Sequence, residues 1–337
     1  MQTIIVTGGS GYVAEWVISD LLNHGYQVRA SLRALKKADR VQAAIRRQVA
    51  TDKMSHLSFF QADLTRDVGW TKGMQGADAL FHIASPLGEG TESVAELVKV
   101  AKGGTLNVLQ GAKAAGIKRV VMISSQAAST APRAIGAVEL DDDYWTDRNN
   151  PELVPYYISK VEAEQAAWHF ADQNKLELTT LLPGGIFGPL LDPQVQSSNA
   201  LVSELLKMSL IPPVHLEVVD VRDLAVAMRL SLNAPVAVGR RYNVGTEPTT
   251  FPKIAALYRQ NGSRQKRVAL TVPSEIIRLA AKFQPALRQL LPQLGVKYWH
   301  NRHHIQADLQ WHPRAWEDTM IASAESLRKW QLTEERS

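Results

Sequence analysis

The chain has 337 residues, 45% of them hydrophobic, and a formal net charge of +5 at pH 7. This length allows one large domain or two. It contains no cysteine, which excludes disulfide frameworks, cysteine zinc sites and thiol nucleophiles. Lysine and arginine are spread along the chain and form no basic stripe with interleaved aromatic residues, so we expect no nucleic-acid partner.

We also expect no membrane partner. The first predicted strand begins within two residues of Met1, which leaves no room there for the charged and apolar regions of a secretory signal. No apolar run reaches the ~18 residues that span a bilayer. These features, with the absence of cysteine, predict a cytoplasmic protein, and they leave open whether it is a monomer or a homodimer.

Residues 3–14, TIIVTGGSGYVA, predict a strand, a glycine turn and a helix that begins near Tyr12. Glycine permits the backbone angles of such a turn and lets a pyrophosphate approach the backbone. The helix N-terminus offers free N–H groups to the same ligand. The spacing Gly8-x-x-Gly11-x-x-Ala14 differs from the common GxGxxG pattern, and such turns also occur with nothing bound. A dinucleotide is the ligand that suits the turn best.

A second strand, Gln27–Leu32, completes a strand–helix–strand unit. An NAD-specific site carries a carboxylate after this strand to bind the ribose hydroxyls. Here the sequence continues RALKK, which places Arg33 and Lys37 where a 2′-phosphate would lie. These cations also suit the solvated first turn of a helix predicted over Ala38–Ala50. If the unit binds a dinucleotide, they favour NADPH over NADH.

The next two strands end in residues that suit the passage of a cofactor. The strand Leu57–Gln61 is followed by Asp63 and Leu64, placed to hold an adenine ring, although Asp63 is equally suited to capping a helix. The strand Ala79–Ile83 is followed by Ala84, Ser85 and Pro86. Open parallel sheets bind ligands at these strand ends.

A helix is predicted over Ser93–Gly116 and a fifth strand over Arg119–Ile123. Asn107 on this helix either binds backbone or water near the active site or, as is more common for an asparagine in mid-helix, is a polar surface residue. The polar stretch Thr130–Pro155 predicts a loop over the mouth of the site. Its consecutive carboxylates, Asp141 to Asp143, have no further ligand at metal-binding spacing, so we interpret them as solvated rather than as a metal site.

Pro155 suits the first turn of a helix that carries Tyr156 and Lys160. Residues four apart lie on one helix face, so the hydroxyl and the ammonium point the same way. A pair of this kind arises by chance in roughly one chain of three, and Tyr156 would also suit a half-buried position on an amphipathic helix. The Tyr156–Lys160 pair therefore indicates an active site only in combination with the other motifs of the chain.

The rest of the chain predicts strands at Leu178–Leu182, Leu216–Asp223 and Arg241–Val244, then short helical pieces from Phe251 on. These pieces include helices at Ser274–Phe283 and Trp316–Trp330. The histidines at 300, 303 and 304 lack a carboxylate at zinc spacing, so we interpret them as a polar loop and expect no metal.

The order of elements predicts an α/β, doubly wound parallel sheet of the Rossmann type with a smaller, mostly helical C-terminal cap that binds substrate. We place the NADP-binding domain at residues 1–185 plus about 215–250, and the cap at about 186–214 and 251–337. We expect the substrate pocket to be lined by residues of 130–155, 185–215 and the cap. Its apolar wall is expected at Ile186, Phe187, Val195 and Met208.

The sequence resembles the extended short-chain dehydrogenase/reductases, and within them the dihydroflavonol 4-reductase group and related microbial ketone and aldehyde reductases. The resemblance covers nearly the whole chain and is strongest over residues 1–225. It rests on the following segments in this order: TGGSGYVA at 7–14, VRASLRALKKADRV at 28–41, DLT at 63–65, FHIASP at 81–86, GGTLNVL at 103–109, KRVVMISS at 118–125, DDDYWTD at 141–147, PYYISKVEAE at 155–164, PGGIFGP at 183–189 and VDVRDLA at 219–225.

This resemblance implies a Ser, Tyr, Lys active site at Ser125, Tyr156 and Lys160, and phosphate binding by Arg33 and Lys37. Two residues depart from the family pattern: Ala14 replaces the third glycine, and Gln126 stands where a small residue is usual. The predicted cofactor contacts are Thr7, Gly8, Gly9, Ser10, Gly11, Tyr12, Val13, Arg33, Lys37, Asp63, Leu64, Ala84, Ser85, Pro86, Tyr156, Lys160, Pro183, Gly184, Ile186, Ser197 and Ser198.

The predicted chemistry is NADPH-dependent reduction of a ketone or aldehyde to an alcohol. A tyrosine hydroxyl is a weak acid unless a nearby cation stabilises the phenolate, so we expect Tyr156 to be the general acid, Lys160 its activator and Ser125 the group that orients the carbonyl. The alternatives are an NAD-dependent sugar-nucleotide epimerase or dehydratase, and a non-catalytic NADP sensor.

Overall fold

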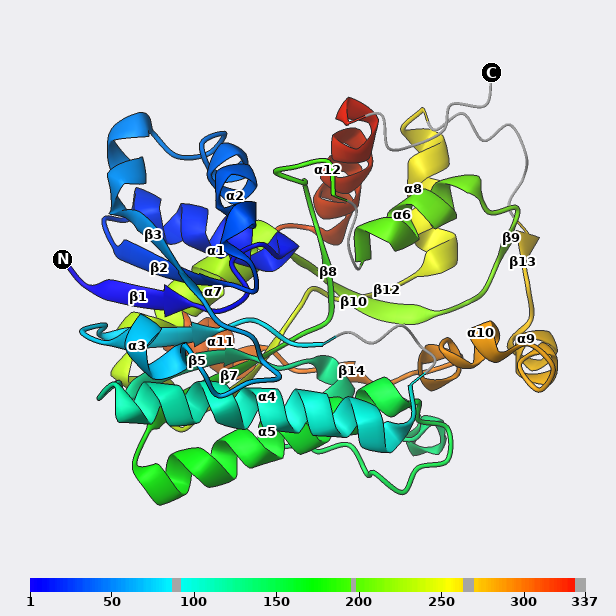
Figure 1. The fold of residues 1–337 in the computed structure, drawn as a ribbon. Coiled ribbons are helices and arrows are strands. Elements are labelled where there is room, and N and C mark those ends of the chain that lie inside the picture. Colours follow the sequence, from blue (N-terminus) through cyan, green and yellow to red (C-terminus); the bar gives the residue numbers. More distant parts are fainter. Residues whose placement is uncertain (87–91, 195–197, 263–269, 331–337) are drawn as a thin grey trace.

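The computed structural model describes residues 1–86, 92–194, 198–262 and 270–330, and a seven-stranded parallel sheet forms its centre (Figure 1). The strand order is β11-β7-β5-β4-β1-β2-β3. The order reverses between β1 and β4, which is the switch point where doubly wound sheets bind ligands. The predicted fold class is therefore confirmed. The strands are β1 (Thr3–Val6), β2 (Gln27–Leu32), β3 (Leu57–Gln61), β4 (Ala79–His82), β5 (Arg119–Ile123), β7 (Glu177–Pro183) and β11 (Arg241–Val244).

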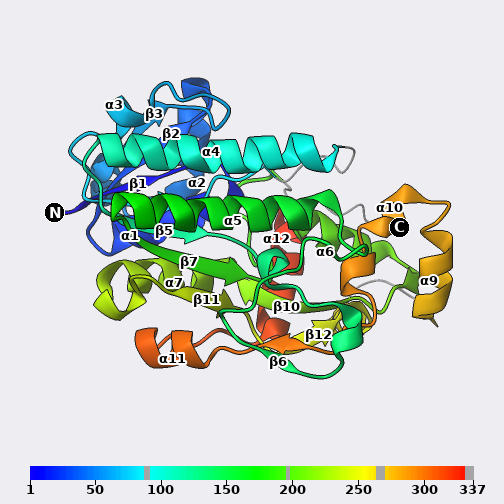
Figure 2. The same cartoon turned by 90° about the horizontal axis from the view of Figure 1, so that it is seen from below.

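Helices cover both faces of this sheet. One face packs against α1 (Tyr12–Asn23), α2 (Ala38–Ile45), α7 (Val221–Asn233) and α11 (His303–Leu309). The other packs against α3 (Trp70–Met74), α4 (Val94–Ala114) and α5 (Pro155–Asn174), and Figure 2 shows α4 and α5 side by side. Strands covered on both faces are apolar without alternation, as in β1, where Ile4, Ile5 and Val6 are fully buried.

The long helix α4 shows how local sequence sets an element. Ser93 is its N-cap: the Ser93 hydroxyl accepts the Glu96 N–H, and the Glu96 carboxylate accepts the Ser93 N–H, which is a capping box. On the buried side of α4, a Cβ added at Gly111 would lie 2.5 Å from the Cβ of Trp70. Glycine at this position therefore lets α4 pack closely against α3.

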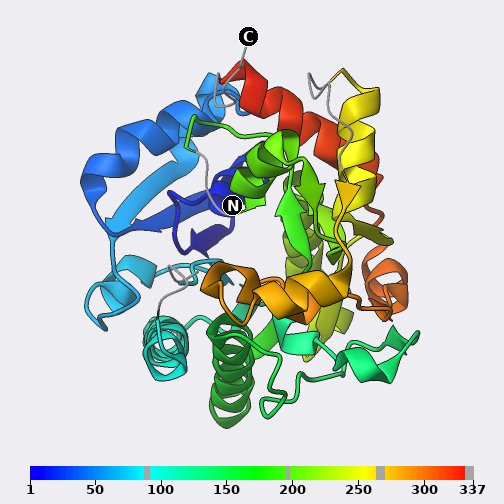
Figure 3. The same ribbon diagram turned by 90° about the vertical axis from the view of Figure 1, so that its right-hand side faces the viewer.

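The C-terminal cap contains more strand than the sequence predicts. Its core lies between helices and a small sheet in the order β12-β10-β8, seen on the right of Figure 1 and facing the viewer in Figure 3. The elements are β8 (Gly185–Phe187), β10 (His215–Asp220), β12 (Pro248–Thr250), the pair β9 (Leu210–Ile211) and β13 (Leu270–Thr271), α6 (Ser198–Lys207), α8 (Phe251–Gln260), α9 (Ser274–Ala280), α10 (Pro285–Arg288) and α12 (Trp316–Lys329).

The domain boundaries stay a prediction. The contacts of β10 and of α11 show which part of the fold each of these elements joins. β10 pairs with β8 and β12 rather than with the central sheet. α11 packs in the same core as α1 and α7, and the indole of Trp311 beside it donates to the backbone oxygen of Asp223 at 2.9 Å.

Several strands begin and end at the predicted residues, and other elements end earlier than predicted. β2, β3, β5 and β11 have the predicted ends. The strand predicted over 216–223 ends at Asp220 because its carboxylate accepts the Arg222 N–H and caps α7. The helix predicted over 38–50 ends at Ile45. Within the described residues, no helix is both long and apolar enough to cross a membrane.

The stretch 130–155 is not simply a loop. It contains β6 (Glu139–Leu140), which pairs with β14 (Trp299–His300) from the far end of the chain. The prediction that Asp141 to Asp143 are all solvated is wrong for Asp142, which is 5% exposed and whose carboxylate accepts the Asn243 N–H at 2.7 Å. The stretch is therefore fixed against β11 and β14.

Two glycines on α4 give a matched test of this packing. We expect Gly111→Ala to lower the free energy of unfolding by about 1–3 kcal/mol, because the added methyl overpacks against Trp70. A Cβ at Gly103 would meet nothing within 4 Å, so Gly103→Ala should raise it by up to about 1 kcal/mol through helix propensity. Urea unfolding at 25 °C measures both, and equal effects of the two substitutions would contradict the packing described.

Candidate active site

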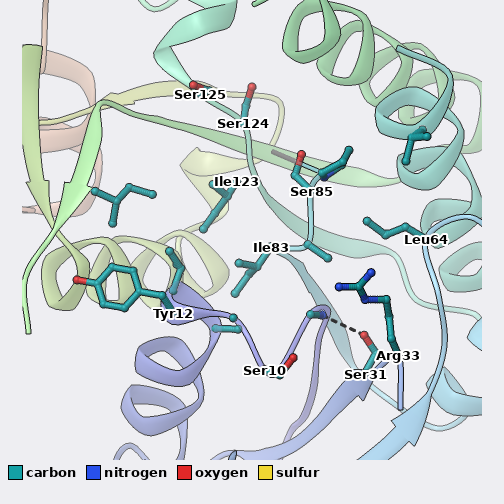
Figure 4. Close-up of a pocket in the computed structure, with 18 of the residues that line it drawn as sticks. Ser10, Tyr12, Ser31, Arg33, Leu64, Ile83, Ser85, Ile123, Ser124 and Ser125 are labelled. Atoms are coloured by element: carbon teal, nitrogen blue, oxygen red, sulfur yellow. Dashed lines mark hydrogen bonds between the residues drawn. The ribbon is translucent and has the colours of Figure 1, made fainter. Parts of the chain in front are cut away.

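A cavity of about 550 Å³ follows the carboxyl ends of the central strands. Figure 4 shows the Arg33 guanidinium and the Ser125 hydroxyl far apart on two sides of it, with Ser85 between them. Nearly all predicted site residues line this cavity: Gly8, Ser10, Gly11, Tyr12, Val13, Arg33, Lys37, Asp63, Leu64, Ala84, Ser85, Pro86, Ser125, Tyr156, Lys160, Pro183, Gly184, Ile186 and Ser198.

Two predicted cofactor contacts, Thr7 and Gly9, are not among the lining residues of this cavity. Thr7 is buried behind the cavity wall, where its hydroxyl accepts the N–H groups of Ile83 and Ala84 at 2.9 and 3.0 Å. Gly9 packs against β2, where an added Cβ would lie 2.7 Å from the Cβ of Ala30. Ser197 lies outside the described residues. Thr7 and Gly9 therefore support the wall instead of forming it.

Sequence reasoning missed a further set of lining residues. They are Ala14, Ser31, Ala62, Thr65, Trp70, Ile83, Val100, Ile123 and Ser124. Ile83, Ile123 and Ser124 directly follow or end a strand, so the rule that identified their neighbours could have found them. Trp70 and Val100 come from helices on one sheet face, and their place depends on tertiary packing.

The glycine turn is built to receive an anion. Gly8 has φ +69°, and a Cβ there would lie 2.9 Å from the Cβ of Ala84, so only glycine fits without strain. The Gly8 N–H donates to the Ser31 hydroxyl at 3.0 Å. No side chain caps the N-terminus of α1. Because the first turn of a helix leaves backbone N–H groups unpaired, this end of α1 can bind a phosphate.

The far end of the cavity is lined by the cations Arg33 and Lys37 and by an ordered turn at residues 63–65. Asp63 accepts the Thr65 N–H at 2.9 Å, and this hydrogen bond, together with the Thr65 hydroxyl and the nearby arginines, holds the pKa of Asp63 below its usual value. It therefore orders a turn rather than capping a helix. Asn107 on α4 donates to the Leu64 backbone oxygen at 2.9 Å, so it fixes this turn, and of the two readings of Asn107 the structure favours the backbone contact near the site.

Ser125, Tyr156 and Lys160 lie together at the other end. Lys160 Nζ lies 5.3 Å from the centre of the Tyr156 ring and donates to the Ser85 hydroxyl at 2.7 Å. Ser125 Oγ accepts the Ala127 N–H at 3.1 Å, which leaves the Ser125 hydroxyl hydrogen able to donate to a ligand. The three groups can thus surround one reacting carbonyl.

A second cavity, of about 330 Å³, adjoins the first. Both cavities are lined by Ser125, Tyr156, Pro183, Gly184 and Ser198. A ligand in one cavity therefore meets a ligand in the other at the serine and the tyrosine.

The wall of the second cavity matches the expected one in part, since residues of 185–215 and of the cap line it. Phe187 lines it as predicted, while Ile186 faces the first cavity and Val195 lies outside the described residues. No described residue of 130–155, nor Met208, is among its lining residues. Residues 289–300 take that place, because the pairing of β6 with β14 brings them to the site.

A buried carboxylate, Glu164, lies behind the site and joins the helix that carries Tyr156 and Lys160 to neighbouring strands. Glu164, one turn beyond Lys160, is fully buried and accepts the Ser124 hydroxyl at 2.6 Å and the Thr180 hydroxyl at 2.7 Å. Arg241 pairs with it at 2.9 Å. Glu164 thus joins α5 to Ser124 just after β5, to Thr180 within β7 and to Arg241 at the start of β11. The sequence motif contains this glutamate, but sequence reasoning gave it no role.

The prediction that the histidines at 300, 303 and 304 form a polar loop is wrong, because His303 and His304 begin α11 and His300 is buried. It lies in β14, is 4% exposed, and its Nδ1 lies 3.0 Å from Glu217 Oε1. Burial alone would lower the pKa of His300, but the Glu217 carboxylate and the Ser129 backbone oxygen outweigh it and raise the pKa above its usual value.

The fold also brings His304 to the acidic run that the sequence leaves isolated. His304 Nδ1 lies 2.9 Å from Asp142 Oδ2, and Asp141 lies beside them. The hydrogen bond to Asp142 raises the pKa of His304, and burial raises the pKa of Asp142. The pair therefore fixes α11 to the 141–147 segment.

Comparison with known proteins gives the family. Residues 4–245 match the model of the NAD dependent epimerase/dehydratase family. The chain belongs to this family. The chain is also 34% identical over 247 residues to a cinnamoyl-CoA reductase, CAD2, of Medicago truncatula, covering 71% of this chain and 74% of that protein.

Two further comparisons support the expected resemblance. A dihydroflavonol 4-reductase of Hordeum vulgare is 29% identical over 248 residues, covering 70% of this chain and 69% of that protein. Among solved structures, the yeast methylglyoxal/isovaleraldehyde reductase Gre2 complexed with NADPH has a TM-score of 0.79 at 20% identity, covering 99% of this chain and all of that one. The resemblance to dihydroflavonol 4-reductase-like reductases is confirmed.

The buried Glu164 charge predicts a large stability effect. Glu164→Gln removes the charge that compensates Arg241, so we expect the free energy of unfolding to fall by about 3–5 kcal/mol. Glu162 on the same helix pairs with Lys102 at 3.1 Å and with Arg148, whose side chains are 44% and 53% exposed.

The control for this prediction is Glu162→Gln. It should change the free energy of unfolding by no more than about 1 kcal/mol, because exposed ion pairs contribute little. Denaturant unfolding of both variants at pH 7 checks the pair, and a Glu164 variant as stable as the Glu162 variant would refute the account of Glu164.

Proposed function

We propose that the protein reduces a ketone or aldehyde to an alcohol with NADPH. The observation that carries this proposal is the meeting of two cavities at Ser125 and Tyr156, one of them with the cations Arg33 and Lys37 at its far end. The first cavity suits an extended dinucleotide and the second a small organic molecule. Relatives named as reductases of carbonyl compounds support the same reading.

The residues of the first cavity fit NADPH. The uncapped N-terminus of α1 and the glycine turn would bind the pyrophosphate, and Arg33 and Lys37 would bind the 2′-phosphate, for which a guanidinium is well suited. The small side chains of Ala84 and Ser85 leave room for the cofactor over the end of β4. When bound, NADPH supplies the hydride for reduction of a carbonyl carbon.

The protein itself has to supply the proton that the carbonyl oxygen takes up during reduction. Tyr156 donates it to the carbonyl oxygen as the alkoxide develops. The Lys160 ammonium lies against the Tyr156 ring, and its positive charge stabilises the phenolate that remains. Ser125 donates a hydrogen bond to the same oxygen, which orients the carbonyl and stabilises developing charge. Glu164 holds the Ser125 and Lys160 segments in place from behind.

Two other functions remain distinguishable by experiment. An NAD-dependent sugar-nucleotide epimerase or dehydratase would use the same three residues but retain its cofactor, so denaturation would release stoichiometric NAD. Arg33 at the end of β2 disfavours that reading, because the NAD-specific carboxylate is missing there. A non-catalytic NADP sensor would have no need of the Tyr156–Lys160 pair. A cytoplasmic location and the oligomeric state stay predictions.

The first functional prediction concerns Tyr156. Tyr156→Phe removes the proton that the reaction needs, so kcat should fall about a hundredfold or more, while the dissociation constant for NADPH changes little. Steady-state rates at the nicotinamide absorbance and a fluorescence titration of NADPH measure the two quantities. Near-normal turnover in this variant would reject the role of Tyr156, and with it the choice of an enzyme over a sensor.

The second functional prediction concerns the cofactor. Arg33→Ala should raise KM for NADPH relative to KM for NADH about 10- to 100-fold, because it removes a charge-assisted hydrogen bond to the 2′-phosphate. Lys36→Ala is the control, since Lys36 is not among the lining residues of the cavity and its loss should leave the ratio unchanged. An unchanged ratio in the Arg33 variant would remove the NADPH assignment.

A further inference from the structure

Large apolar side chains are exposed at the end of the cap that lies opposite the N-terminus in Figure 1. We call this group the cap tip. Each member is more than half exposed, and Phe283 is 81% exposed. The cap tip consists of Leu210 on β9, Leu270 on β13, Ile276 and Leu279 on α9, and Phe283 just after α9. Exposed apolar side chains that gather in one place mark a surface that binds a partner or a membrane.

Strand pairing and chain order keep the cap tip together. Leu210 and Leu270 are partners in the parallel pair β9–β13, and two residues separate the end of β13 from the start of α9. α9 already has a buried side, since Ile277 and Ala281 are buried. In Figure 3 the helices α9 and α10, drawn in orange, face the viewer. The exposed side of α9 is therefore not needed for packing within the cap.

This part of the cap is also basic. Lysine and arginine occur along the whole chain, but residues 251–262 and 270–302 contain seven of them and a single acidic residue, Glu275. Lys282 and Arg288 are exposed, and neither pairs with a carboxylate in the part of the chain that the structure describes. The Arg288 guanidinium donates to the backbone oxygens of Ala281 and Lys282, which places it beside α9. Two uncompensated cations therefore lie next to Phe283.

The positive charge distinguishes between possible occupants of the cap tip. In a symmetric dimer formed through this patch, the same basic surface would face itself, and like charges placed together cost binding free energy. Neither of the two cavities described above is lined by a cap-tip residue, so these side chains protrude and do not line a groove. Apolar side chains that protrude beside lysine and arginine are typical of proteins that lie on an anionic bilayer.

The basic surface reaches the wall of the second cavity. Arg288 directly precedes Gln289 and Leu290, which line that cavity. A bilayer in contact with this surface would thus bring the second cavity close to apolar compounds dissolved in lipid.

We propose that the cap tip, with Lys282 and Arg288, binds the surface of a bilayer that contains anionic phospholipid. Ile276, Leu279 and Phe283 enter the boundary between headgroups and acyl chains, and the two cations attract the negative charge of the lipid. The expectation of no membrane partner rests on the lack of a membrane-spanning segment, and binding through a surface patch needs none. This inference does not depend on the proposed reduction.

The test is co-sedimentation of the purified full-length protein with sucrose-loaded vesicles. One set of vesicles is phosphatidylcholine alone, and the other is an equal mixture of phosphatidylcholine and phosphatidylglycerol. The wild type should partition onto the mixed vesicles about tenfold or more strongly than onto the neutral ones, and this preference should shrink in high salt. Phe283→Ser should lower the partition coefficient on mixed vesicles about tenfold, and Lys282→Gln about fivefold.

Val68→Ser and Lys118→Gln are the matched controls. Val68 is 74% exposed and Lys118 is exposed, and both lie outside the cap. Both variants should bind mixed vesicles as the wild type does, and an unchanged melting temperature checks that every variant is folded.

Three results would overturn the inference. The first is a wild type that binds neither kind of vesicle or binds both equally. The second is a loss of binding in Lys282→Gln without a loss in Phe283→Ser, which would indicate attraction to any polyanion, including an acidic protein. The third is a wild-type dimer in sedimentation velocity that Phe283→Ser converts to a monomer, which would assign the cap tip to a second copy of the chain.

Discussion

The geometry of the site depends on the hydrogen bonds that the buried carboxylate of Glu164 accepts. This carboxylate lies at the centre of a buried set of hydrogen bonds that reaches Ser124 just after β5, Thr180 on β7 and Arg241 on β11. Each of these contacts joins α5, which carries Tyr156 and Lys160, to a different strand. The positions of a helix and of a strand end are otherwise set by apolar packing, which is not directional. Hydrogen bonds to the Glu164 carboxylate are directional, so they fix the position of α5 relative to the strands.

A second constraint joins the nucleotide side of the molecule to its cap. The chain leaves the central sheet at β7 and enters the small sheet at β8, with Gly184 between them. A Cβ at this glycine would lie 2.1 Å from the Glu217 backbone oxygen, so β10 could not approach so closely with any other residue there. This approach places Glu217 in the wall of the second cavity. The same contact therefore brings lining residues of the second cavity close to Ser125 and Tyr156.

Sequence reasoning predicted those parts of the site that follow from local pattern and parallel topology. Ser125 and Ala84 lie at the carboxyl ends of neighbouring strands, and such ends meet at one edge of a parallel sheet. The Tyr156–Lys160 spacing follows from helical periodicity. The glycine turn and the cations after β2 have fixed places in the strand–helix–strand unit.

What it did not predict depends on contacts between distant segments. Gln126 and Glu217 are 91 positions apart, and Asp142 and His304 are 162 apart. No periodicity relates such residues, and their pairing follows only once β14 has paired with β6 and β10 with β8. The interpretation of His300 and Asp142 as solvated failed for this reason. Burial of a charged residue is decided by its partner, and the partner is supplied by the tertiary fold.

The central claim is that the cofactor and the substrate meet between Ser125 and Tyr156. A crystal structure of the protein with NADP⁺ tests it most directly. The account predicts the 2′-phosphate between Arg33 and Lys37, and the nicotinamide ring beside Tyr156 with one face open to the second cavity. A nicotinamide ring that lies away from Tyr156, or a dinucleotide bound outside the first cavity, would contradict it.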